Sequence, residues 1–290
     1  MTLPINAEIA GRLDDVAQIL EEHGANPYRV LAYRRAANLL RGLARSVVDL
    51  VRAEGVEGLE QLPGIGTSLA RSIRDLALTG RLPMLDRLRG ESDPIELLTS
   101  VPGVGRVLAE RLHTDLGIDT LEELEAAAHD GRLARIEGFG SKKLAGIRDT
   151  LAHRLGRVRR PSAGEDLDEE AALEELLDVD AEYRAKALSG ALPTIAPRRL
   201  NPTHERWLPV LHTTRGARHY TALFSNTPHA HALGTTRDWV ILYYDAGHGE
   251  RQCTVITAQR GPLAGRRIVR GREDECLAHY AAPAPESASG

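Results

Sequence analysis

Three copies of one short glycine turn constrain the fold of this chain more than any other feature of its sequence. The copies read "LPGIGTSLARSI" at residues 62–73, "VPGVGRVLAERL" at 101–112 and "IEGFGSKKLAGI" at 136–147. In each copy a Gly-apolar-Gly turn stands between apolar positions, and the first two copies then place an alanine where the third has Leu144. Three matches to one pattern in the first half of the chain indicate an internal repeat.

The glycines of such a turn explain its geometry. They reach backbone conformations that are closed to other residues, and they let another backbone approach. The helix that follows begins with unpaired N–H groups and the positive end of its dipole, which suits a phosphate and reads no base. We expect Ile65, Val104 and Phe139 to point inward, and Ala70 and Ala109 to let the paired helices cross closely. This is the helix-hairpin-helix motif; the alternative is that the turns only connect helices of a bundle.

The remaining signals before residue 160 are also helical. Asn6 is placed to cap a first helix, and Asn26 followed by Pro27 predicts the start of a second helix. No stretch in this part alternates as a strand would. We therefore predict that residues 1 to about 158 are all helical.

The net charge of −4 conceals a strong division along the chain. Residues 1–160 carry 23 basic and 23 acidic side chains, whereas residues 161–182 carry 10 acidic side chains and no basic one. Residues 183–290 carry 14 basic and 8 acidic side chains. The acidic segment predicts a solvated linker helix. The alternative is a segment that competes with DNA for the basic surfaces beside it.

After residue 200 the pattern predicts strands separated by turns. The run from Trp239 to Tyr244 is apolar throughout, which is typical of a central strand buried on both faces. The expected strands lie within 206–214, 218–226, 238–245, 251–259 and 266–271, and short helices are expected within 227–234 and 273–280. Cys253 and Cys276 are too few for a disulfide framework or a four-cysteine zinc site.

The fold class expected is multidomain, with an all-α helix-hairpin-helix N-terminal half and a small α+β C-terminal domain. The first helical domain takes residues 1–90 and the second, with two hairpins, takes 91–158. An acidic linker helix (159–195), a small basic α+β domain (196–282) and a disordered tail (283–290) follow.

Residues 6 to about 155 resemble the lyase-like domain and the fingers of family X DNA polymerases, as found in DNA polymerase β and in bacterial members. The resemblance is carried by "NPYRVLAYRRAANLLRGL" at 26–43, the first hairpin and "LPMLDRLRG" at 82–90, in the order of that family. It implies binding at the two sides of a gap or nick. By position, Tyr28 would stack on a template base and Arg29 would meet the 5'-phosphate. The alternative for Tyr28 is packing against the bundle.

The resemblance also shows what this chain lacks. In the family, a lysine amine forms a Schiff base with an abasic sugar, and Ser72 stands in its place here; Ser68 replaces a phosphate-binding lysine. No lysine precedes Lys142, and arginine has no nucleophilic amine to offer. After residue 155 we find no paired aspartates on an apolar strand, because "DVD" at 178–180 lies in the acidic segment. The polymerase palm is therefore interpreted as replaced.

The C-terminal half gives weaker signals. "HAH" at 229–231 would suit a metal only with partners that the sequence does not show at motif spacing. Asp238 and Asp245 bracket the predicted central strand and fit turn residues better than catalytic ones. Arg266, Arg267 and Arg270 form a basic edge that either binds phosphate or deters strand pairing.

These observations predict a bacterial, cytoplasmic, nucleoid-associated protein that binds nicked or gapped DNA, or DNA ends, in repair. No apolar run approaches the roughly 18 residues that span a bilayer. We expect neither polymerase nor lysine-based lyase activity, no metal, and no cofactor beyond, at most, a monovalent cation at the hairpin turns.

The alternatives are a DNA-processing enzyme with a C-terminal active site (nuclease, lyase or nucleotidyl transfer), and an adaptor for a repair protein. The predicted DNA-binding residues are Tyr28, Arg29, Arg34, Arg35, Gly64, Ile65, Gly66, Gly103, Val104, Gly105, Arg106, Gly138, Gly140, Lys142, Lys143, Arg266, Arg267 and Arg270.

Overall fold

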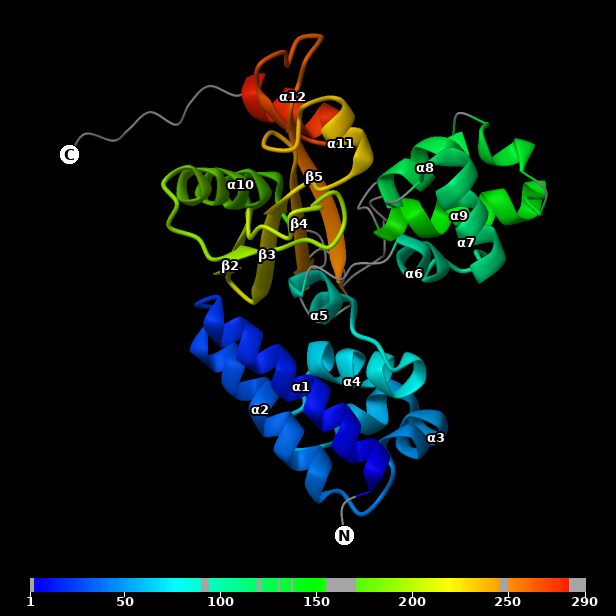
Figure 1. Ribbon diagram of the computed structural model, residues 1–290, viewed down its shortest axis with the longest axis vertical. Coiled ribbons are helices and arrows are strands. Elements are labelled where there is room, and N and C mark those ends of the chain that lie inside the picture. Colours follow the sequence, from blue (N-terminus) through cyan, green and yellow to red (C-terminus); the bar gives the residue numbers. More distant parts are fainter. Residues whose placement is uncertain are drawn as a thin grey trace.

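The computed structural model describes residues 3–89, 94–118, 121–129, 131–136, 138–154, 171–245 and 250–281. The expected disordered tail and the first part of the expected acidic linker lie outside these ranges. As Figure 1 shows, a first helical unit, a second helical unit and a sheet domain follow one another along the chain. The multidomain organisation, helical first and then α+β, is as expected.

The first helical unit comprises α1 (Pro4–Glu22), α2 (Pro27–Gly42), α3 (Val47–Glu60), α4 (Thr67–Thr79) and α5 (Pro83–Leu88). The second comprises α6 (Pro94–Thr99), α7 (Arg106–Leu116), α8 (Leu121–His129), the 3-10 turn η1 (Leu133–Arg135) and α9 (Ser141–Arg154). The sheet domain comprises α10 (Leu173–Leu188), β1 (Thr194–Ile195), β2 (Leu208–Arg215), β3 (Arg218–Phe224), α11 (Pro228–Ala232), β4 (Val240–Asp245), β5 (Arg251–Thr257), β6 (Arg267–Val269) and α12 (Glu273–Ala281).

The two predicted helix caps have different outcomes. Asn26 caps α2 as expected, because its side chain accepts a hydrogen bond of 2.9 Å from the amide of Tyr28. The prediction for Asn6 is wrong, since α1 already begins at Pro4. The Asn6 side chain is instead fully buried, where it donates to the carbonyl of Arg45 and accepts from the amide of Val47. It thus fixes the entry into α3 against α1.

Two separate clusters of buried apolar side chains hold the described residues together. One is confined to the second helical unit and runs from Leu98 to Leu151. The other joins the first helical unit, from Ile9 to Leu88, with the sheet domain, from Ala171 to Cys276. The first and last parts of the chain therefore share one core, and the second helical unit has a core of its own.

The strands form one antiparallel sheet whose order follows the sequence, β1-β2-β3-β4-β5-β6 among the described residues. Because side chains alternate along a strand, β4 presents Val240, Leu242 and Tyr244 to one face of the sheet. That face is apolar and is covered by α10 (Figure 1). Ile241 and Tyr243 point to the other face, toward the helical units. The expectation that this strand is buried on both faces holds for Val240 to Leu242.

The expected solvated linker helix is α10, and the interpretation that it is solvated is wrong. Val179 and Tyr183 are fully buried against the sheet. The Tyr183 hydroxyl donates to the carbonyl of Pro209 and accepts from the amide of Phe224, so it pins α10 across β2 and β3. The acids of the helix pair with arginines of the sheet, which explains why so acidic a segment lies beside so basic a domain.

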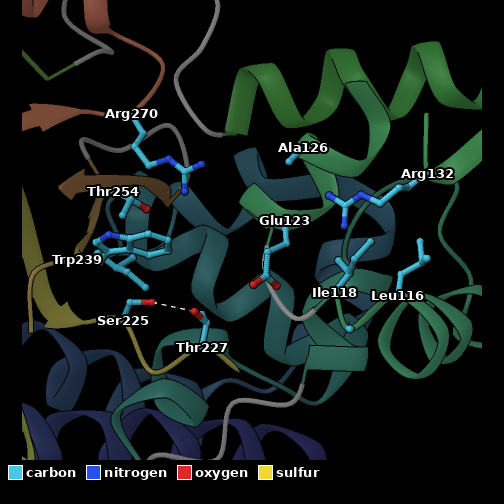
Figure 2. A pocket seen from close by; sticks show the side chains of 12 residues that line it. Leu116, Ile118, Glu123, Ala126, Arg132, Ser225, Thr227, Trp239, Thr254 and Arg270 are labelled. Atoms are coloured by element: carbon cyan, nitrogen blue, oxygen red, sulfur yellow. Dashed lines mark hydrogen bonds between the residues drawn. The ribbon is translucent and has the colours of Figure 1, made fainter. Parts of the chain in front are cut away.

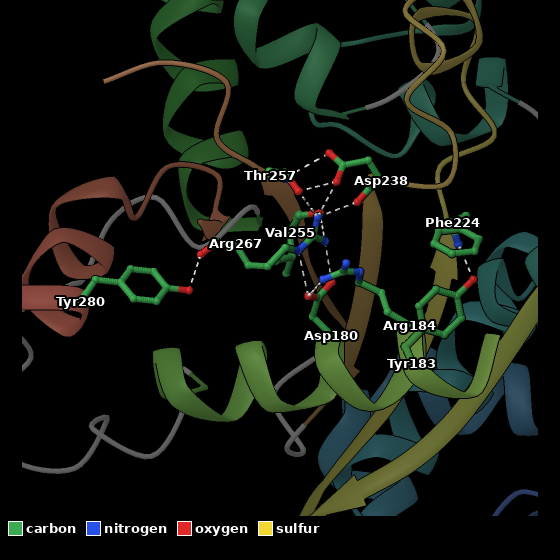
Figure 3. A network of polar contacts seen from close by, with 9 residues as sticks. All are labelled: Asp180, Tyr183, Arg184, Phe224, Asp238, Val255, Thr257, Arg267 and Tyr280. Atoms are coloured by element: carbon green, nitrogen blue, oxygen red, sulfur yellow. Dashed lines mark hydrogen bonds and ion pairs between the residues drawn. The ribbon is translucent and has the colours of Figure 1, made fainter. Parts of the chain in front are cut away.

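A buried ion-pair network ties α10 to the far edge of the sheet (Figure 3). The guanidinium of Arg267 on β6 contacts both carboxylate oxygens of Asp180, at 2.9 and 2.6 Å, and also Asp238 at 2.8 Å. Asp238 in turn accepts from the amide and the hydroxyl of Thr257. Burial raises the pKa of Asp180, which is only 1 % exposed, although Arg267 acts in the opposite direction. Without Arg267, the buried carboxylate of Asp180 would keep only the more distant Arg184, at 3.9 Å, to compensate its charge.

Replacing Arg267 with alanine is therefore expected to lower the free energy of unfolding by about 3 kcal/mol. Arg266→Ala is the matched control, because the neighbouring arginine is exposed. The double variant Asp180→Asn with Arg267→Met is expected to regain part of the loss. Urea unfolding followed by far-ultraviolet circular dichroism measures all three, and equal losses in the Arg267 and Arg266 variants would contradict the assignment.

Candidate nucleic-acid interface

Each of the three glycine turns joins two helices in the way that the repeat predicts. Gly64, Gly103 and Gly138 have positive φ angles of 79°, 91° and 103°, a conformation that glycine adopts without strain. Ile65, Val104 and Phe139 are buried, at 5 %, 3 % and 8 % exposure, which confirms that the middle residue of each turn points inward. Ala70 and Ala109 are fully buried, also as predicted.

The second glycine of each turn differs from the first. Gly66 and Gly105 are the N-cap residues of α4 and α7, with ordinary φ angles of −87° and −78° and no side-chain cap. A Cβ atom at either position would meet nothing within 4 Å, so neither the backbone nor the packing within the chain requires glycine here. The open space lies beside the free N–H groups at a helix N-terminus, where an anion is favoured. A glycine at this place suits the close approach of an external backbone.

The second and third hairpins pack against each other reciprocally. A Cβ atom at Gly103 would lie 3.6 Å from the side chain of Lys143 on α9, and one at Gly138 would lie 3.9 Å from Leu108 on α7. The two turns are thereby held in one rigid unit. Lys142 and Lys143, both exposed in the first turn of α9, add positive charge there. Arg106, in the first turn of α7, is exposed and pairs with Glu110 at 3.1 Å.

The first hairpin lies against the sheet domain. The hydroxyl of Ser68, in the first turn of α4, donates a 2.5 Å hydrogen bond to the carboxylate of Asp245 at the end of β4. Ser72 donates to the carbonyl of Ser68, one helical turn earlier. The position where the resemblance places a phosphate-binding lysine therefore holds a carboxylate of the same chain. A carboxylate beside a helix N-terminus is stabilised by the helix dipole.

Further polar contacts extend this junction between the first helical unit and the sheet. We call it the seam, and it comprises the pairs Ser68–Asp245, Arg87–Glu250 and His23–His212. The guanidinium of Arg87 lies 3.5 Å above the ring of Tyr243 and forms an ion pair with Glu250. His23, just after α1, contacts His212 of β2, with 3.3 Å between the two ring nitrogens. The seam thus joins the first helical unit to the polar face of the sheet.

Burial in the seam favours neutral histidines. It lowers the pKa of His212 well below its usual range, and the nearby charge of Arg29 adds to the effect. The pKa values of His23 and His219 are lowered as well, again mainly by burial. Asp245 raises the pKa of His219 and so partly opposes the shift. The sequence analysis singled out Ser68 as the replacement of a lysine and Asp245 as a turn residue, but it did not predict the contact between them.

The residues that the resemblance assigned to DNA lie on α2. Tyr28 is 83 % exposed, so it does not pack against the bundle and its ring faces solvent. Arg35 is exposed as well. Arg34 pairs with Glu21 at 2.5 Å, and Arg29 is half-buried with its guanidinium 3.2 Å from the sulfur of Met84.

The three arginines of the expected basic edge lie in different surroundings. Arg267 is held in the buried network, as described above. Arg266 lies over the ring of Tyr280 at 5.2 Å. Arg270 lies over the indole of Trp239 at 5.5 Å. In the "HAH" stretch, the His231 ring contacts Asn226 at 2.7 Å, and the side chain of His229 lies outside the described residues.

Comparison with known proteins agrees with this geometry. Residues 4–82 match the family model of a helix-hairpin-helix domain, and residues 95–152 match that of a SAM-like helix-hairpin-helix tandem. The helical half is built of helix-hairpin-helix domains. The chain is also 28 % identical over 136 residues to the DNA polymerase/3'-5' exonuclease PolX of Bacillus subtilis (strain 168), a match that covers 47 % of this chain and 23 % of that protein. The helical half is therefore similar to part of an X-family polymerase, and the match spans less than a quarter of this relative. No helix among the described residues is long and apolar enough to cross a membrane.

The two glycines of a turn are expected to respond differently to alanine. Gly64→Ala places a side chain at a φ of 79° and should lower stability by about 1–2 kcal/mol. Gly66→Ala should cost less than about 1 kcal/mol, because its φ is ordinary and its surroundings are open. If the open space at the second turn receives a phosphate, Gly105→Ala should weaken DNA binding about tenfold, because the added Cβ keeps the phosphate from the N–H groups. Gly66→Ala should change the affinity less, since Asp245 already lies at that helix N-terminus. Thermal unfolding and fluorescence anisotropy with labelled DNA measure the two effects; unchanged affinity in the Gly105→Ala variant would contradict this use of the turns.

Acid is expected to weaken the seam. The folded state keeps His212 neutral, so unfolding takes up a proton when the pH falls below the ordinary value of 6.5, and stability that is complete above that value is lost below it. Each proton taken up lowers stability by about 1.4 kcal/mol per pH unit. Urea unfolding at pH 7.5 and 5.5 should show a smaller acid loss for His212→Gln than for the wild type. His129→Gln, an exposed position on α8, is the control, and an equal reduction there would refute the assignment.

Proposed function

We propose that this chain binds DNA by its structure rather than by its sequence, at nicks, gaps or ends, in DNA repair. The proposal depends on one observation. The second glycine of the turn is required neither by its backbone conformation nor by packing within the chain. Backbone N–H groups at such turns meet phosphates and do not distinguish bases. The PolX relative, whose name describes a DNA polymerase and exonuclease, supports DNA as the ligand.

In this proposal the second and third hairpins bind phosphates, and the first helical unit binds an unpaired base. The second and third turns, locked together and flanked by Lys142 and Lys143, grip the phosphates of one duplex segment. Tyr28 supplies an exposed ring to the other side of the break, because an aromatic ring stacks on any unpaired base. The free ring is the reason to prefer a gap or an end over intact duplex, in which no base face is open.

We further propose that the first hairpin carries no lysine-based lyase chemistry. Ser68 and Ser72 occupy the places of the amine groups, and Ser68 holds Asp245 instead. Borohydride reduction on abasic DNA is expected to trap no covalent complex. A trapped complex would show that another amine, such as that of the N-terminus, takes part.

DNA binding should weaken as salt rises, with a slope of about −0.9 in log affinity against log salt for each phosphate contacted. Anisotropy titrations with nicked, one-nucleotide-gapped and intact duplex at several salt concentrations measure both slope and preference. The double variant Lys142→Ala, Lys143→Ala should reduce the slope by about 2. Lys186→Ala, on α10, is the control and should leave the slope unchanged.

Two results would overturn the proposal. One is an affinity that does not change with salt. The other is equal affinity for gapped and intact duplex, together with no effect of Tyr28→Ala on the gapped substrate.

A further inference from the structure

A cavity of about 230 Å³ lies between the second helical unit and the sheet domain (Figure 2). The sheet wall is formed by Ser225, Trp239, Thr254 and Arg270 among others, and the helical wall includes Glu123 and Arg132. In Figure 2 the indole of Trp239 and the guanidinium of Arg270 lie on one side, with Glu123 facing them. Pockets between separately folded units are frequent ligand sites.

The sheet wall combines an aromatic ring with buried hydroxyl groups. Trp239 is half-buried, so its ring is partly open, and an indole is a stacking surface for a flat heterocycle. Ser225 and Thr254 are only 2 % and 4 % exposed. The hydroxyl of Ser225 contacts that of Thr227 at 3.2 Å (Figure 2), and since each hydroxyl offers one donor and two acceptor sites, this pair can still bond to a ligand. Hydroxyl groups beside an aromatic ring suit the polar edge of a nucleobase better than they suit a purely apolar ligand.

The charge of the cavity favours an anion. Arg270 is half-buried, its guanidinium lies 5.5 Å from the centre of the Trp239 ring, and no carboxylate pairs with it among the described residues. Its backbone amide donates to the carbonyl of Thr254, which fixes its position on the sheet. The opposite wall adds one positive group, Arg132, and one negative group, Glu123, so the lining keeps one net positive charge. Arginine beside an aromatic ring can stack and bind phosphate at once.

The size of the cavity limits the ligand. A volume of 230 Å³ is below the range of about 300–1,000 Å³ that is typical of sites for drug-sized molecules. The cavity therefore suits a ligand no larger than about one nucleotide unit, and not a dinucleotide or a duplex.

We propose that this cavity binds one nucleotide unit, with its base stacked on Trp239 and its phosphate at Arg270. The unit is either a free nucleotide or one residue of single-stranded DNA; the second source deepens the function proposed above and rests on it.

The position of the cavity predicts how long a piece of single-stranded DNA must be to reach it from the second hairpin turn. Helix α7 begins at the second hairpin turn and ends in the helical wall at Leu116, after 11 residues. At 1.5 Å per residue the two ends are about 16 Å apart. A DNA strand whose phosphates are held at the turn therefore needs about five stacked nucleotides, at 3.4 Å each, to place a nucleotide in the cavity.

The chain offers a direct reporter, because it has only two tryptophans. In a Trp207→Phe variant, all tryptophan fluorescence comes from Trp239. We would titrate this variant with deoxyadenosine monophosphate, with inorganic phosphate, with blunt duplex, and with duplex that carries a single-stranded overhang of one or of six nucleotides. Base stacking should quench the fluorescence with the nucleotide, with the six-nucleotide overhang, or with both, and not with phosphate or blunt duplex.

The expected result includes a loss of about tenfold in the affinity measured by quenching when Arg270 is replaced with alanine. Arg260→Ala removes the same charge at an exposed position outside the cavity and should leave the affinity unchanged. Quenching by the free nucleotide alone identifies a nucleotide site, and quenching by the long overhang but not the short one identifies a strand site. No quenching by either, or equal quenching by phosphate alone, overturns the inference.

The two proposals can fail independently. Preference for gapped DNA is read by anisotropy of labelled DNA, which does not depend on Trp239. Intact gap preference without quenching refutes only the nucleotide site. Quenching by the nucleotide without gap preference refutes only the proposed use of the hairpins.

Discussion

The alternation of side chains along β4 is the constraint on which the arrangement of the chain depends. Val240, Leu242 and Tyr244 point to the apolar face that α10 covers, while the intervening positions point toward the helical half. Along that second set, Ile241 borders the cavity, Tyr243 lies under Arg87, and Asp245 accepts from Ser68. A shift of one residue in register would exchange the two faces and remove every one of these contacts.

The repeat and the strand pattern predicted much of this structure because both are local signals. A Gly-apolar-Gly turn determines its own geometry, and the alternating segments after residue 200 became strands close to the expected bounds. The burial of α10 could not be predicted, because a run of acidic residues indicates a solvated helix. Only the fold brings Arg215 and Arg267 against these acids. The seam could not be predicted for the same reason, since Ser68 and Asp245 are 177 residues apart. The cavity escaped prediction too, because its walls come from two separate cores.

The hairpins illustrate how one motif can serve two purposes in one chain. The second and third turns keep exposed surroundings and carry the lysines, which suits an external polyanion. The first turn has serines, and the sheet domain supplies Asp245 to the same helix N-terminus. The preference of a helix N-terminus for negative charge is thus met inside the molecule at one hairpin and left open at the other two.

The separate core of the second helical unit has a consequence for cooperativity. The buried cluster that joins the first helical unit to the sheet does not include this unit, so the chain holds two cooperative units that need not unfold together. The cavity has one wall in each of them. A molecule bound there would contact both units and would couple their unfolding, by an amount that grows with the logarithm of its concentration relative to its Kd and without any new contact between the two cores.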